Sequence, residues 1–250
     1  MKSVTQVKSH ECFNQITGRR IKALIAVHLY GHPSQIDKIA DICKRYHIEL
    51  IEDCAESLGS FYRSKHTGSW GRCAILSFNG NKIITAGGGG ALLTRDAKLA
   101  ENLRHISTTA KLPHPWNTEH DQVGYNYRMP CINAALGMAQ LKRIDSIRNA
   151  KRELANGYER LLQGVEGVRF ITEPKHANSN YWLNTIVLDP SAQQSRDEIL
   201  KQLVNNGFIA RPAWHRMQAL EHLKDVPAAD LQVSKDLSQR IINLPSGVFV

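Results

Sequence analysis

The first part of the chain combines two short apolar runs with an amphipathic segment between them. Residues 21–30 form a mostly apolar run rich in β-forming side chains, which predicts a strand buried on both faces, and residues 48–53 form a second run ending in acid. Between them, apolar side chains recur at helical spacing over residues 36–46, and Ser34 with Asp37 predicts a capping box at the helix start. Strand, helix and strand in this order predict a βαβ unit with parallel strands.

The pattern continues with further strands and then a helical stretch. Residues 73–78 and 90–94 predict a third and a fourth strand, and residues 97–106 predict a short helix. Over residues 131–162 an apolar stripe lies opposite many charges, which predicts one long helix or two in succession. We expect this stretch to carry the chain out of a first domain.

The C-terminal part predicts a smaller α+β domain. We place the boundary so that residues 1–145 form a large domain with a mainly parallel sheet and residues 146–250 form the small domain. In the small domain, Ser195 and Glu198 predict a capping box for a helix that ends at Gly207. Strands are predicted at residues 168–171, 181–189 and 208–214.

Composition limits the classes of protein that this chain can represent. Hydrophobic residues make up 42% of the 250 residues, which is enough for a substantial core. The N-terminus has no apolar signal segment, and no apolar run approaches the roughly 20 residues needed to cross a bilayer. Five cysteines without a C-x-x-C pair are expected to be reduced thiols. We therefore expect a cytoplasmic protein with no membrane contact.

The formal net charge of +9 does not identify a partner. Lysine and arginine residues are scattered and no basic run is interleaved with aromatics, so the charge favours a solvated basic surface over a nucleic-acid interface. The same positive field would attract a phosphorylated cofactor or a diphosphate-linked substrate. The eleven histidines show no H-E-x-x-H motif or other close metal spacing, so we expect no metal site.

Three polar side chains lie at or just beyond the ends of predicted strands. Asp53 and Ser77 each come at the end of an apolar run, and Lys82 follows Ser77 by five residues. Ligands gather at the carboxyl ends of parallel strands in open α/β sheets. Beyond Lys82, four consecutive glycines at 87–90 allow positive φ and close backbone approach, although taken alone they indicate only a tight turn. They follow the lysine, so they do not form a P-loop.

A lysine, an acid and a hydroxyl grouped at strand ends are the groups that a pyridoxal phosphate enzyme requires. The lysine amine forms a Schiff base with the cofactor and moves a proton, and the carboxylate pairs with the pyridine nitrogen so that the ring accepts electrons. The hydroxyl can donate to the phosphate. Spacing alone does not decide this interpretation, because surface lysines are common and an Asp at a strand end often serves a turn.

Longer blocks of the sequence are more specific. They are HLYGHPSQIDKI, IEDCAESLGSFY, GSWGRCAILSFNGNKIITAGGGGALLT, GYNYRMPCINAALGMAQL, ARPAW and NLPS. In this order, and over almost the whole chain, they resemble the DegT/DnrJ/EryC1/StrS aminotransferase family. The resemblance implies an α/β, fold-type-I pyridoxal phosphate transferase similar to aspartate aminotransferase.

A branch of that family is indicated by three segments. SFNGNKIIT, TTAKLPHPW and HDQVGYNYRMP are most similar to the branch that aminates UDP-4-keto-6-deoxy-N-acetylhexosamines for legionaminic acid or related surface sugars. The resemblance thus implies conversion of a UDP-linked 4-keto sugar to its 4-amino form, with glutamate as the amino donor.

Carried over residue by residue, the resemblance implies that Lys82 holds pyridoxal phosphate and that Asp53 pairs with its pyridine nitrogen. Glu56 stands where many members have Gln or His packed near the cofactor ring. Ser77 would bind the cofactor phosphate. Asn126 would reach the phosphate bound by the neighbouring subunit, so a homodimer would share its active sites; an ordinary loop amide is the alternative.

Candidates for the sugar-nucleotide pocket follow only from their positions in the matching blocks. An alternative exists for two of them, because His120 could cap a loop and Trp214 could be a core residue. The candidates are His120, Arg211, Trp214 and His215.

The chain departs from the family pattern at its front. Members normally begin with a long segment in which a Gly-Thr or Gly-Ser element at a helix N-terminus cradles the phosphate and an aromatic side chain stacks on the ring. Residues 1–20 supply neither, and a helix N-terminus is a favourable phosphate site because its N–H groups and dipole face the anion. We therefore expect an N-terminally truncated chain whose large domain is incomplete, with uncovered apolar surface and a sheet edge.

Other interpretations stay open. A catalytically silent remnant of such an enzyme would act, if at all, only by association with other chains. A sugar dehydratase of the same fold is disfavoured, because such relatives lack the lysine found here at position 82. A basic nucleic-acid binder would show salt-dependent binding to DNA or RNA.

Overall fold

The computed structural model describes residues 4–248, which divide into two compact units. The first unit comprises the residues up to Asp145 together with Lys175–Asn180, and the second comprises Ser146–Pro174 and the residues from Tyr181 onward. Each unit has its own cluster of buried apolar side chains. The hydrophobic pattern gave no sign that Lys175–Asn180 would lie with the first unit.

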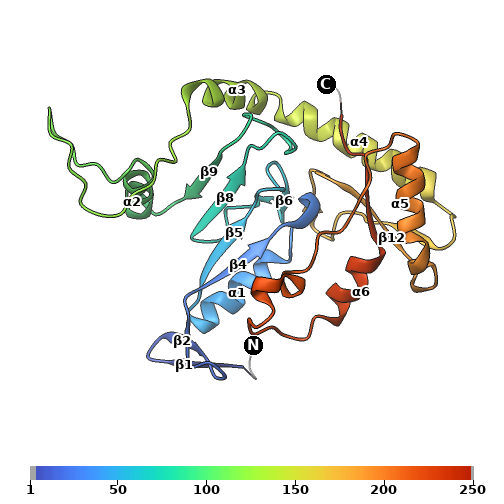
Figure 1. The fold of residues 1–250 in the computed structure, drawn as a ribbon, viewed down its shortest axis with the longest axis horizontal. Helices are drawn as coiled ribbons and strands as arrows, with labels where there is room; N and C mark the ends of the chain where they lie inside the picture. The colour runs from blue at the N-terminus through green and yellow to red at the C-terminus, as the bar shows by residue number, and fades with distance from the viewer. Residues whose placement is uncertain (1–3, 249–250) are drawn as a thin grey trace. The chain divides into compact units, whose positions relative to one another are not determined.

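The first unit is built on a sheet with the strand order β4-β5-β8-β9 (Figure 1). β4 (Ala23–Val27), β5 (Glu49–Asp53) and β8 (Cys73–Ser77) are parallel, and β9 (Gly90–Thr94) runs antiparallel to β8. Helix α1 (Ile36–Tyr46) connects β4 to β5. The predicted βαβ unit and mainly parallel sheet are confirmed.

Helix α1 covers one face of this sheet. Its buried Ile36 packs with Ala26 of β4 and Leu50 of β5. On the opposite face of β4, Ile25 is 62% exposed and Val27 is 48% exposed. The prediction that this strand is buried on both faces is therefore wrong, because a continuous apolar run does not distinguish a strand covered on one side from a strand covered on both.

The predicted capping box of α1 is also wrong. Gln35 holds the N-cap position, and no side chain makes a capping hydrogen bond there. Ser34 contacts His28 instead: its backbone N–H donates to His28 Nδ1 at 3.1 Å, and its hydroxyl lies 3.4 Å from the same atom. Ser34 therefore binds the imidazole and does not cap the helix.

Short antiparallel strands complete the first unit. A small sheet of β1, β2 and β3 precedes β4 and was not predicted, and a second small sheet has the order β11-β6-β7. The strands are β1 (Thr5–Lys8), β2 (Glu11–Asn14), β3 (Arg20–Ile21), β6 (Phe61–Tyr62), β7 (Lys65–His66) and β11 (Ala177–Asn178).

Three longer helices follow the main sheet, as predicted. α2 spans Ala97–Ser107, and the region expected to hold one helix or two holds α3 (Cys131–Leu141) and α4 (Ile144–Leu162). The boundary between the units falls in the first turn of α4. Asp96 caps α2 by accepting the N–H of Leu99 at 3.0 Å. No helix within residues 4–248 is long and apolar enough to span a bilayer.

The second unit contains an antiparallel sheet with the order β10-β12-β14-β13. Its buried cluster includes Phe170, Ile186 and Ile242. Of the strand predicted over residues 208–214, only Arg211–Pro212 pairs. The elements are β10 (Val168–Phe170), β12 (Asn184–Leu188), β13 (Arg211–Pro212), β14 (Ile241–Leu244), α5 (Arg196–Asn205) and α6 (Gln232–Arg240).

The start of α5 differs from the predicted capping box. Ser195 is the N-cap residue, but its side chain makes no capping hydrogen bond and its backbone is already helical. A 3-10 turn over Pro190–Ser195 runs directly into α5, so the extended backbone that a capping side chain needs is absent. Other 3-10 turns lie at Leu29–Gly31, Met217–Ala219 and Glu221–Leu223.

Candidate active site

Asp53 and Ser77 lie on one face of the main sheet, near the carboxyl ends of neighbouring parallel strands. Asp53 of β5 pairs with Ile75 of β8, and Ser77 follows Ile75 by two residues. Paired residues, and residues two apart on one strand, share a face of the sheet. The carboxylate and the hydroxyl therefore project from the same face at the edge where α/β proteins bind ligands.

Local hydrogen bonds orient both side chains. Asp53 Oδ1 accepts the backbone N–H of Ala55 at 3.0 Å, and Ser77 Oγ lies 3.5 Å from the backbone nitrogen of Asn79. Each side chain is thus turned toward the residues that leave its strand.

Lys82 lies in a loop that is closed at both ends. The N–H of Phe78 donates to the carbonyl of Gly89 at 3.0 Å, and the N–H of Ala86 donates to the carbonyl of Phe78 at 2.9 Å. The two residues after Lys82 are buried isoleucines. Because the loop is anchored in the core next to Lys82, the backbone from which the Lys82 side chain extends is held in a defined place.

The glycines after Lys82 have the conformations that the sequence predicted. Gly87 and Gly89 have φ values of 78° and 80°. A Cβ at Gly90 would lie 2.3 Å from the carbonyl oxygen of Leu76, so β9 can approach β8 here only with glycine at this position. Positive φ and close approach are both confirmed.

The Lys82 amine faces a largely buried carboxylate. Lys82 Nζ lies 3.9 Å from Glu56 Oε1, and each side chain is 13% exposed. Glu56 Oε2 accepts the backbone N–H of Tyr30 at 2.7 Å. Burial raises the pKa of Glu56 above its ordinary value and nearby Asp53 acts in the same direction, whereas the Tyr30 N–H and Lys82 act in the opposite one. The loop after β8 thus meets the loop after β5 at an ion pair.

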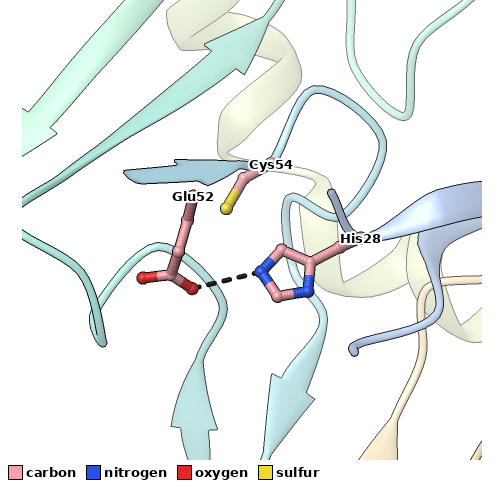
Figure 2. A group of neighbouring side chains, drawn as sticks. All are labelled: His28, Glu52 and Cys54. Atoms are coloured by element: carbon pink, nitrogen blue, oxygen red, sulfur yellow. Dashed lines mark hydrogen bonds and ion pairs between the residues drawn. The ribbon is translucent and has the colours of Figure 1, made fainter. Parts of the chain in front are cut away.

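A second buried carboxylate, Glu52, lies one residue before Asp53 (Figure 2). Its Oε1 accepts the N–H groups of Trp70 and Gly71, both at 2.7 Å. Its Oε2 accepts the N–H of Gly68 at 2.8 Å and lies 3.1 Å from His28 Nε2. Burial alone would raise the pKa of Glu52, but the hydrogen bonds from His28 and the three backbone N–H groups outweigh it and lower the pKa below its ordinary value.

The tautomer of His28 follows from its neighbours. A backbone N–H can only donate, so His28 Nδ1 accepts from Ser34 and carries no proton. We infer a neutral ring whose Nε2–H donates to Glu52. His28 follows β4, Glu52 lies in β5 and the three donating N–H groups precede β8, so this network ties together the strands that carry Asp53 and Ser77.

His28, Glu52 and Cys54 place ligand-type atoms within 4.8 Å of one another (Figure 2). The hydrogen bonds already described occupy the carboxylate oxygens and both ring nitrogens. Burial raises the pKa of the Cys54 thiol to about 12, so the sulfur keeps its proton at neutral pH. We therefore assign this group a structural role.

Hydrogen bonds from the buried residues Asn180 and Ser60 hold the loop after β5 in place. Asn180 Nδ2 donates to the carbonyls of Glu56 at 2.9 Å and Leu58 at 2.8 Å, and its backbone N–H donates to Ser60 Oγ at 2.9 Å. Ser60 Oγ in turn donates to the carbonyl of Gly31. Sequence reasoning missed Asn180, because this residue lies more than a hundred residues from its partners. It also missed Glu52, although an acid inside an apolar strand is a usable signal of a buried network.

Asn126 and His120 lie in the irregular stretch between α2 and α3. Both are exposed. Asn126 forms an isolated bridge with Thr108, and His120 Nδ1 donates to the carbonyl of Thr109 at 2.7 Å. His120 thus makes a hydrogen bond within its loop, as the loop-capping alternative predicts. The roles of both residues toward a ligand stay predictions.

Arg211, Trp214 and His215 lie in the second unit and are exposed. The ring of Trp214 stacks on that of Trp182, with centroids 6.1 Å apart and an interplanar angle of 6°. Trp214 is 54% exposed, so it is not a core residue. Trp214 and His215 also line a hollow of about 290 Å³, whereas Arg211 is not among its lining residues.

Comparison with known proteins places these features in a family. The sequence profile of the DegT/DnrJ/EryC1/StrS aminotransferase family matches residues 2–249. EpsN of Bacillus subtilis (strain 168) is 39% identical over 230 residues, which cover 90% of this chain and 58% of EpsN. GDP-perosamine synthase of Vibrio cholerae is 36% identical over 233 residues, which cover 91% of this chain and 62% of the synthase.

The fold agrees with solved structures of sugar aminotransferases. PseC of Helicobacter pylori, an aminotransferase involved in the biosynthesis of pseudoaminic acid, superposes with a TM-score of 0.85 at 24% identity, covering 90% of this chain and 61% of PseC. At this identity the likeness shows the fold alone, which confirms the predicted fold-type-I α/β class. The chain spans about 60% of the length of these relatives. It belongs to the DegT/DnrJ/EryC1/StrS aminotransferase family, whose members depend on pyridoxal phosphate.

Proposed function

We propose that this chain carries the cofactor lysine and part of the substrate site of a sugar-nucleotide aminotransferase. The reaction would move the amino group of glutamate to a UDP-linked 4-keto-6-deoxy-N-acetylhexosamine and give the 4-amino sugar. The observation that carries the proposal is the strand-end cluster of Lys82, Glu56, Asp53 and Ser77. The amine of Lys82 faces the largely buried carboxylate of Glu56, and Asp53 and Ser77 lie on one face of the adjoining strands.

The residues present fit pyridoxal phosphate by the chemistry of their side chains. When bound, this cofactor supplies an aldehyde carbon and an electron-withdrawing ring. Lys82 would bond that carbon and move a proton to and from the substrate carbon. Asp53 would keep a proton on the ring nitrogen, and the Ser77 hydroxyl would donate to the phosphate. Because one lysine would serve both halves of the exchange, ping-pong kinetics are expected.

A second copy of the chain is part of this proposal. Asn126 lies in a stretch whose apolar side chains are largely exposed, including Trp116, Val123 and Tyr127. Several exposed apolar side chains in one stretch support a protein contact surface. We propose that this stretch contacts the partner of a homodimer, where Asn126 would reach the cofactor phosphate of the partner's site.

The substrate proposal rests on the sequence blocks and on the second unit. An aromatic side chain beside a hollow suits a sugar or a base, and Arg211 and His215 suit a diphosphate. GDP-perosamine synthase is among the relatives, so a GDP-linked sugar is the competing substrate. We propose the UDP-linked sugar, because the segments around Lys82 and Asn126 resemble that branch.

The experiment that tests the function is transfer of ¹⁵N from labelled glutamate to UDP-linked and GDP-linked 4-keto-6-deoxy sugars, followed by mass spectrometry. We expect labelled UDP-4-amino sugar from the wild type and from Lys44→Ala, an exposed lysine in α1, and none from Lys82→Ala. Transfer only to the GDP-linked sugar would replace the substrate proposal. Without transfer to either sugar, the silent-remnant interpretation would take the place of the enzyme.

A further inference from the structure

The strand-end cluster contains one group whose placement the proposed reaction does not explain. Glu56 is a carboxylate enclosed beside the amine of Lys82, with each side chain 13% exposed and the closest N···O distance 3.9 Å. Enclosing a carboxylate is unfavourable unless it is paired or hydrogen-bonded. Two independent features of the structure hold Glu56 in this position.

The first feature is the backbone of Tyr30. This residue is buried and has a φ of 58°, a left-handed conformation that is uncommon for a bulky side chain. In this conformation its N–H donates to Glu56 Oε2 at 2.7 Å. Strained backbone of this kind persists only where its surroundings enforce it, and it clusters at functional sites. The strain here aims a donor at one oxygen of Glu56, while the other oxygen faces Lys82.

The second feature is the clamp made by Asn180. Its side-chain amide donates to the carbonyl of Glu56 and to that of Leu58. Asn180 is completely buried. The backbone of Glu56 is therefore held by Asn180, and its carboxylate is held by Tyr30.

The charged groups facing Glu56 are Lys82 from the loop after β8 and Asp53 from the end of β5. Asp53 repels a charge on Glu56 and burial disfavours it, whereas Lys82 favours it. The Tyr30 N–H and Lys82 both favour the charged form of Glu56. Protonation of Glu56 at lower pH would weaken its hold on the amine.

We propose that Glu56 is a positioning residue whose carboxylate pairs with the Lys82 amine and holds it at the strand ends, where it can bond a carbonyl carbon. The inference rests on the proposed function, in which Lys82 is the lysine that bonds the cofactor. A neutral amine is the nucleophile and a facing carboxylate favours the ammonium, so a variant without this carboxylate is expected to react at lower pH.

The experiment measures the reactivity of Lys82 without the cofactor. Trace labelling of the full chain with acetic anhydride over a range of pH, followed by peptide mass spectrometry, gives the midpoint at which Lys82 becomes reactive. In Glu56→Gln we expect this midpoint to fall, because the opposite charge facing the amine is removed. Glu56→Asp should restore part of the shift. Glu49→Gln removes an exposed carboxylate from the start of β5, the strand that precedes Glu56, and should leave the midpoint unchanged.

A second measurement separates this inference from the proposed function. Wild type and Glu56→Gln are incubated with pyridoxal phosphate and reduced with borohydride, and pyridoxyl-labelled Lys82 is measured against pH. We expect labelling in both proteins, with the Glu56→Gln profile displaced to lower pH. Labelling with the same pH profile and the same acetylation midpoint would overturn the role of Glu56 while supporting Lys82. A shifted midpoint without pyridoxyl labelling would support the role of Glu56 and overturn Lys82 as the cofactor lysine.

Discussion

Replacing Glu52 by Gln tests whether the buried network supports the strand ends. Glu52 is completely buried, and each carboxylate oxygen accepts two hydrogen bonds: the N–H groups of Trp70 and Gly71 on one, and the N–H of Gly68 with His28 Nε2 on the other. Glutamine has nearly the same shape but only one acceptor oxygen. Whichever way the amide is turned, two buried donors face an NH₂ group.

The size of the effect follows from those two donors. Leaving a buried donor without an acceptor costs about 1–3 kcal/mol, so two donors give a loss of about 2–6 kcal/mol in the free energy of unfolding. A typical domain is stable by about 5–15 kcal/mol, so this loss would be a large fraction of its stability. Glu49→Gln, which changes an exposed carboxylate on the same strand, should cost less than about 0.5 kcal/mol.

Urea denaturation followed by far-UV circular dichroism measures these losses as a change in midpoint at constant slope. Acid supplies a second readout. The pKa of Glu52 is lowered in the folded chain below its ordinary value of 4.5, so its stabilising contribution is present above that value and is lost as the pH falls through the folded pKa. Glu52→Gln should lack this part of the acid sensitivity. A loss below about 1 kcal/mol, with acid sensitivity like that of the wild type, would show that Glu52 does not support the strand ends.

Three further changes have defined outcomes. Gly90→Ala places a Cβ against the carbonyl of Leu76 and should lower the free energy of unfolding by about 1–3 kcal/mol, whereas Gly88→Ala, which meets nothing within 4 Å, should not; urea titration distinguishes them. Asn180→Ala removes the donors to two carbonyls and should cost about 2–4 kcal/mol in the same assay; an unchanged midpoint would argue against the clamp. Burial lowers the pKa of Lys151 to about 8, so its charged form opposes folding below that pH, and stability should rise as the pH increases from about 8 toward the ordinary value of 10.5. Thermal unfolding across this range should show the rise in wild type and not in Lys151→Met.

Much of the fold could be predicted because its signals are local. Strand β4 and helix α1 could be predicted from the spacing of apolar side chains before Asp53. The parallel pairing of β4 with β5 follows from the order of the elements. The glycines after Lys82 were understood because positive φ and the lack of a Cβ are properties of the residue itself.

The features that escaped prediction depend on partners distant in sequence. Ser34 turns from the helix start to His28, and His28 is placed by Glu52, so the capping error follows from a network that no local pattern shows. Asn180 lies more than a hundred residues after the loop that it clamps. The contact between Glu56 and Lys82 likewise depends on how the loop after β5 meets the loop after β8.

We propose above all that the amine of Lys82 is the group that bonds pyridoxal phosphate. Borohydride reduction of the chain with pyridoxal phosphate, followed by digestion and mass spectrometry of every lysine peptide, tests this proposal. We expect one predominant pyridoxyl group on Lys82, greatly reduced by Asp53→Asn and absent from Lys82→Ala. Labelling spread over exposed lysines, with Lys82 unmodified and Asp53→Asn without effect, would contradict it.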